Sequence, residues 1–64
     1  MKNNETVNLL EKYNEASYKD KAQILYHALG WMEAYNGYSI NTCIKLGVND
    51  HFDLNLKTSD IING

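Results

Sequence analysis

The side chains of this sequence with the widest catalytic and metal-binding chemistry are two histidines and one cysteine, His27, His51 and Cys43. Metal sites usually combine His, Cys and carboxylate ligands at short, recurring spacings. The nearest pattern here is Asp50-His51-Asp53, whose two aspartates are too close together for a calcium loop of about twelve residues. We therefore interpret this cluster as solvated turn residues and expect no bound metal. His27 is expected to be a partly buried, hydrogen-bonded side chain.

Cys43 and His51 are also the two residue types that form a nucleophilic pair. Such a pair needs, in addition, a group that orients the base and donors that stabilise an oxyanion. The rest of the chain supplies neither, and it has no glycine-rich phosphate loop. A chain of 64 residues also leaves little core around a pocket of about 300 Å³. The sequence therefore predicts a protein that is not an enzyme and has no cofactor, with Cys43 as a small buried apolar side chain.

The charge balance disfavours nucleic acid and membrane surfaces as partners. The net charge is −2, and all six basic residues are lysines. Duplex DNA binding usually shows a basic surface with arginines, and surface-bound membrane helices are also basic. The most apolar stretch, residues 22–35, is too short and too polar to span a bilayer. A single cysteine forms no intramolecular disulfide, which favours a reduced, cytoplasmic protein.

The composition also indicates the kind of genome that encodes the chain. Asparagine, lysine, isoleucine and tyrosine, which have AT-rich codons, are frequent, whereas arginine and proline are absent. In this respect the chain resembles small accessory proteins of phages and plasmids in low-GC bacteria. The resemblance is one of composition, and it transfers no residue roles.

The elements that position these residues are expected to be mainly helical, in one small domain over residues 1–64. A first helix is predicted over residues 5–16, with Asn4 as its N-cap. The strongest helix signal covers residues 18–36. It follows the capping box Ser17-Tyr18-Lys19-Asp20 and ends at Asn36-Gly37, where glycine can adopt a left-handed conformation.

Residues 39–57 allow two interpretations. We favour a short helix over 39–48, which Ser39 caps and Gly47 ends, followed by a short C-terminal strand over 51–57, where apolar and polar residues alternate. The alternative is an α+β fold in which two helices precede a β-hairpin over 39–57. The chain end is expected to form a turn whose Ile61 and Ile62 cover the core.

The helix over 18–36 carries two apolar stripes. One contains Ala22, Leu25, Leu29 and Met32, and the other contains Ile24, Ala28, Trp31 and Tyr35. We expect the first stripe to face the core and the second to stay exposed in a monomer, because one short chain has little with which to cover both. Gly30 and Ala34 would allow another element to approach the helix backbone closely.

Seven aromatic residues are more than a core of this size can bury, and interfaces favour Tyr and Trp as anchors. The sequence therefore predicts a non-enzymatic interaction protein that modulates or inhibits a partner protein, forms a homodimer, or both. The predicted partner-binding residues are Ile24, Trp31, Tyr35 and Tyr38. The alternative is a small nucleic-acid-binding regulator, in which residues 18–46 resemble a helix-turn-helix. Its recognition helix would present Asn41, Thr42 and Lys45 to DNA.

Overall fold

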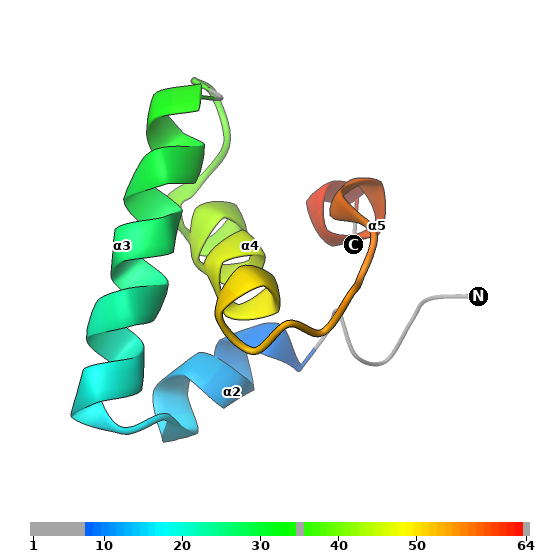
Figure 1. Cartoon of the computed structure of the whole chain (residues 1–64). Helices are drawn as coiled ribbons and strands as arrows, with labels where there is room; N and C mark the ends of the chain where they lie inside the picture. Colours follow the sequence, from blue (N-terminus) through cyan, green and yellow to red (C-terminus); the bar gives the residue numbers. More distant parts are fainter. Residues whose placement is uncertain (1–7, 35, 64) are drawn as a thin grey trace.

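Helices account for most of the chain that the computed structural model describes, residues 8–34 and 36–63. Within this part there is no strand, and the expectation of a mainly α small domain is confirmed. The helices are α2 (Leu9–Glu15), α3 (Tyr18–Ala34), α4 (Ile40–His51) and α5 (Thr58–Asn63) (Figure 1). The predicted cap Asn4 and the first predicted helical residues, 5–7, lie outside the described residues.

Two serines start the longer helices, as the sequence predicted. The Asp20 backbone N–H donates to Ser17 Oγ over 3.2 Å at the start of α3. The Thr42 N–H donates to Ser39 Oγ over the same distance at the start of α4. Each bond satisfies one of the backbone donors that a helix leaves unpaired in its first turn. Between the two helices, Gly37 has a φ of 109°, a left-handed conformation in which glycine carries no Cβ penalty.

Gly47 does not end its helix, which corrects the predicted boundary at residue 48. The helix α4 continues to His51, and Gly47 is buried inside it. A Cβ on Gly47 would lie 2.6 Å from the Ile24 carbonyl oxygen and 3.3 Å from the Ala28 nitrogen. Glycine therefore allows α4 to pack directly against the α3 backbone. The prediction that another element approaches the helix backbone closely at Gly30 is wrong, because a Cβ there would meet nothing within 4 Å.

The strand predicted over 51–57 is also wrong, and with it the alternative hairpin over 39–57. Asp53 and Asn55 have φ values of 53° and 61°, so the backbone is left-handed at alternate positions and cannot extend. Asn49 holds this loop from α4. Its Nδ2 donates to the Leu56 carbonyl over 3.1 Å, and its Oδ1 accepts from the Leu56 N–H over 2.9 Å.

The core lies around α4, which contacts each of the other three described helices. Figure 1 shows α4 nearly end-on between α3 and α5, so it crosses α3 at a steep angle. The buried core cluster takes at least one residue from each helix: Leu9, Ile24, Leu46, Val48 and Ile61. Ile61 thus covers the core as expected, although from a helix and not from a turn. Cys43 is fully buried on α4.

The two stripes of α3 face opposite ways from the prediction. Ile24 and Ala28 are buried against α4, whereas Leu25 and Leu29 are 40% and 57% exposed. The physical reason lies on α4: Gly47 fits against the backbone at Ile24 and Ala28, where the side chain of Ala28 is also small. Apolarity alone could not select this stripe, because both stripes are apolar.

Candidate interaction surface

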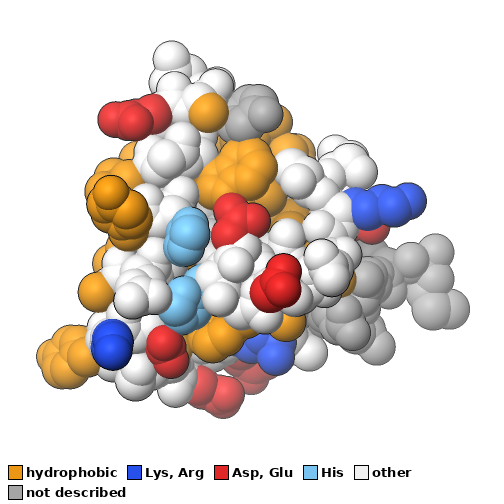
Figure 2. Space-filling view, in the orientation of Figure 1, with side chains coloured by type: hydrophobic (Ala, Val, Ile, Leu, Met, Phe, Trp, Pro, Cys, Tyr) orange, Lys and Arg blue, Asp and Glu red, His pale blue; other side chains and the backbone are white. Residues whose placement is uncertain are grey.

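One side of α3 presents a line of exposed apolar side chains, which we call the α3 seam. Exposed fractions are 95% for Tyr18, 57% for Leu29 and 36% for Met32. The members of the seam are Tyr18, Ala22, Leu25, Leu29 and Met32, all of them exposed. Their spacing alternates between four and three residues, which is the a/d spacing of a coiled coil. Figure 2 shows hydrophobic side chains along the left edge of the molecule, where α3 lies in Figure 1.

The seam borders an apolar groove between α3 and the start of α4. The groove has a volume of about 250 Å³. Its lining consists of Leu25, Ala28, Leu29 and Met32 from α3 and Ile40 and Ile44 from α4. Ile40 lies in the first turn of α4 and is 60% exposed. It therefore forms an apolar rim of the groove. Since every lining residue is apolar, the groove suits the apolar side chains of another chain better than a polar small molecule.

A second line of residues follows the seam on its outer flank. Lys19, Tyr26 and Glu33 each come directly after a seam residue and are seven residues apart. All three are exposed, and Tyr26 is 78% exposed. Seven-residue spacing keeps them on one flank, at the e position of the heptad. The flank is therefore positive at the start of α3, aromatic in the middle and negative at the end.

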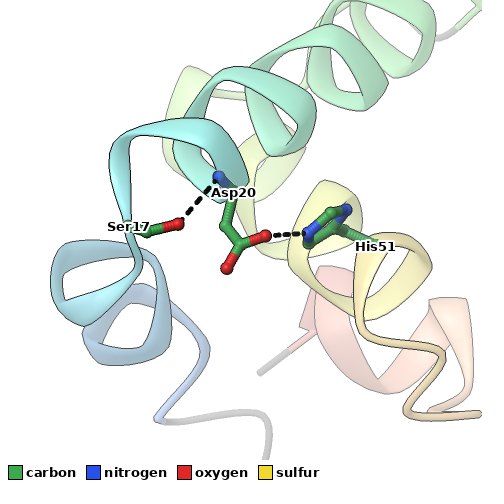
Figure 3. A network of polar contacts seen from close by, with 3 residues as sticks. All are labelled: Ser17, Asp20 and His51. Atoms are coloured by element: carbon green, nitrogen blue, oxygen red, sulfur yellow. Dashed lines mark hydrogen bonds and ion pairs between the residues drawn. The ribbon is translucent and has the colours of Figure 1, made fainter.

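On another side of α3, His51 and Asp20 form a polar contact (Figure 3). Nε2 of His51 lies 2.9 Å from Oδ1 of Asp20, and His51 is largely buried. The hydrogen bond from His51 lowers the pKa of the Asp20 carboxyl below its ordinary 3.8, and a bond with Ser17 contributes. The His27 ring lies 6.2 Å from the His51 ring, and Figure 2 shows the two histidines close together.

The structure does not bring together the Cys43–His51 pair or the Asp50-His51-Asp53 cluster that the sequence singles out. Cys43 is eight residues from His51 on the same helix, which separates them by about 12 Å along the helix axis. His51 contacts Asp20, and not the neighbouring Asp53 with which the sequence grouped it. Among residues 8–34 and 36–63, no three His, Cys, Asp or Glu side chains are placed to hold a metal ion.

Trp31 connects α3 to the end of α4. Its Nε1–H donates to Asp50 Oδ2 over 2.7 Å, and its ring packs against the buried core. An open hollow of about 500 Å³ lies beside it, lined by Tyr26, His27, Gly30, Trp31, Ala34 and Asp50. Trp31 therefore acts as a structural contact between two helices.

Of the four predicted partner-binding residues, the three that the structure describes do not share an exposed face. Ile24 is fully buried, which corrects its expected exposure. Trp31 and Tyr38 are partly buried and pack against the core, and Tyr35 lies outside the described residues. The exposed large apolar residues of the described chain lie instead mostly on or beside the α3 seam; Ile40 and Phe52, from α4 and its C-terminal end, are also exposed. The heptad spacing of the seam is visible in the sequence, but the side on which α4 packs is not.

Comparison with known proteins identifies no protein related to this chain. No protein-family model matches the chain, and no curated protein or solved structure is significantly similar to it. Within the described residues, no helix combines the length and apolarity needed to cross a membrane. The α3 seam and its groove are therefore the features on which a function can be proposed.

Proposed function

We propose that this chain is a small, non-enzymatic interaction protein that binds another protein chain through the α3 seam and the adjoining groove. The observation that carries the proposal is that all five residues of the α3 seam are exposed beside an entirely apolar groove. Soluble monomers rarely expose a contiguous apolar patch without a use for it. An amphipathic helix that enters an apolar groove is a common mode of protein recognition.

Such a protein acts by covering a surface of its partner. It modulates or inhibits its partner, as an accessory protein of a phage or plasmid would, and it works in the cytoplasm. The buried, unpaired thiol of Cys43 is in keeping with a reducing compartment. The separation of Cys43 from His51 along α4 supports a role in binding and not in catalysis.

Nucleic-acid binding is the weaker candidate. In a helix-turn-helix arrangement, α4 would be the recognition helix and its exposed side would face the major groove. Lys45 is the one lysine of α4 and is only partly exposed, whereas Asp50 is exposed and would oppose phosphate. The exposed Ile40 in the first turn favours apolar contact over phosphate contact.

Photocrosslinking in cells that produce the chain naturally tests the proposed function. A photoreactive residue at position 29 lies in the α3 seam. At position 57 it lies in the exposed loop before α5 and serves as the control. We expect protein adducts from position 29 and few from position 57. Equal adduct formation from the two positions, or none from position 29, would contradict the proposal.

A further inference from the structure

We propose that the partner of the α3 seam is a second copy of this chain, with the two α3 helices antiparallel around a two-fold axis near residue 27. This inference rests on the proposed function, since it names the partner of the same surface. It commits to one register, in which Leu25 of each copy packs against Leu29 of the other. Three properties of the described residues support it: side-chain volume, charge and symmetry.

The volumes of four of the five seam residues, all except Tyr18, match in the antiparallel register. In antiparallel helix pairs, each a residue shares a layer with a d residue of the other helix. Leu25 then meets Leu29 in the two central layers, and the small Ala22 meets the long Met32 in the two outer layers. A parallel pair would place Ala22 against Ala22 and Met32 against Met32. One layer would then be underfilled and another crowded, and both defects are destabilising.

The charges of the outer flank match in the same register. The antiparallel arrangement brings the e positions of the two helices together, so Lys19 of one copy faces Glu33 of the other, twice per dimer. Tyr26, which is 78% exposed, faces its own symmetry mate near the axis. Antiparallel helices also place the positive end of one helix dipole beside the negative end of the other. The flank is therefore complementary to itself.

The symmetry of this contact also limits the size of the assembly. A two-fold contact uses the same surface on both copies, so it closes after two chains. The groove lies beside the seam, and its rim residue Ile40 comes from α4 of the same copy. Both grooves are then at the interface, and each is available to the apolar side chains of the other copy.

Charge reversal tests the register. The variants are Lys19→Glu, Glu33→Lys and the double variant, and each single variant turns two attractive pairs into two repulsive ones. Lys57→Glu and Glu11→Lys change the net charge equally, at exposed positions outside the seam. Sedimentation equilibrium at low salt and protein concentrations up to about 1 mM measures the dimer dissociation constant. Circular dichroism verifies that each variant remains helical.

We expect each single reversal to weaken the dimer by about fivefold or more, and the double variant and both controls to remain within about twofold of the wild type. A mixture of the two single variants, one labelled with nitrogen-15, should form mainly heterodimers in native mass spectrometry. Each repulsive pair becomes attractive only in that mixture. Statistical mixing, or equal weakening by the control reversals, would overturn the proposed register.

The failure of this inference and that of the proposed function give different results. A wild-type chain that stays monomeric throughout the concentration range, but forms position-29 adducts with a different protein, overturns the self-pairing alone. A monomeric chain without position-29 adducts overturns both. Adducts at twice the mass of the chain, together with the heterodimer result, support the self-pairing and the use of the α3 seam as a protein-binding surface.

Discussion

Asp20 and His51 join the first turn of α3 to the last residue of α4, with 2.9 Å between Oδ1 and Nε2. The Trp31–Asp50 hydrogen bond makes a second contact between the same two helices, 11 residues further along α3. Between these contacts, Gly47 sits against the α3 backbone. Together they place α4 on the Ile24 side of α3, so the seam remains on the surface.

Acidification should weaken the fold through Asp20. Its folded-state pKa lies below the ordinary value, so ionised Asp20 stabilises the fold above about pH 4. As the pH falls through the lowered pKa, this contribution is lost. The wild type should therefore melt at a higher temperature than Asp20→Asn at pH 6, and the difference should shrink towards pH 2. Thermal melts by circular dichroism measure it, with Glu15→Gln as the control. A difference independent of pH would show that the Asp20 charge contributes nothing.

Two glycines of the α3–α4 pair should respond to alanine with opposite signs. In Gly47→Ala, the new methyl would lie 2.6 Å from a backbone oxygen, which cannot move without shifting α3. We expect a loss of about 1–3 kcal/mol in the free energy of unfolding. In Gly30→Ala, the methyl meets nothing within 4 Å, and the helix gains up to about 1 kcal/mol. Urea denaturation measures both. A neutral Gly47→Ala would mean that the helices are not packed this closely.

The helices were predictable because their signals are local. Ser17 and Ser39 cap their helices through bonds to residues three positions ahead, and Gly37 has the left-handed conformation expected after α3. The strand over 51–57 failed because alternation describes side chains, whereas the left-handed backbone at Asp53 and Asn55 is set by the turn after α4. The Asn49–Leu56 contact that holds this turn spans seven residues.

The orientation of α3 required tertiary information. The sequence shows both stripes, but the choice between Ile24 and Leu25 as the buried residue depends on Gly47, which lies 23 residues from Ile24. From the sequence alone, a glycine near the end of a short helix predicts a stop, because glycine commonly has that role. The partners Asp20 and His51 are 31 residues apart and belong to no motif. The apolar spacing therefore predicts the helix that forms the surface, but it does not determine which of the two sides is buried.

The loop after α4 should depend on the amide of Asn49. This side chain makes both a donor and an acceptor contact with the Leu56 backbone, and the pair is partly buried. Asn49→Ala removes both bonds and leaves the Leu56 groups unpaired, so we expect a loss of about 1–3 kcal/mol in the free energy of unfolding. Amide hydrogen exchange at Leu56 should accelerate more than exchange in α3. Asn41→Ala, on the exposed start of α4, is the control and should change neither quantity appreciably.

Substitutions on the two sides of α3 should have different effects: one side should affect the stability of the fold, and the other should affect self-association. Trp31 packs against the core and bonds to Asp50, so Trp31→Ala should lower the free energy of unfolding by about 2 kcal/mol or more. Leu29 is 57% exposed, so Leu29→Ala should change it by about 0.5 kcal/mol or less. Urea denaturation at dilute, monomeric concentrations makes the comparison. The milder Trp31→Phe keeps an aromatic ring without the Nε1–H donor, in case Trp31→Ala does not fold. At high concentration the order should reverse, with Leu29→Ala reducing self-association more than Trp31→Phe does. If Leu29→Ala instead destabilises the dilute protein as much as Trp31→Ala, the seam belongs to the core and cannot be an interaction surface.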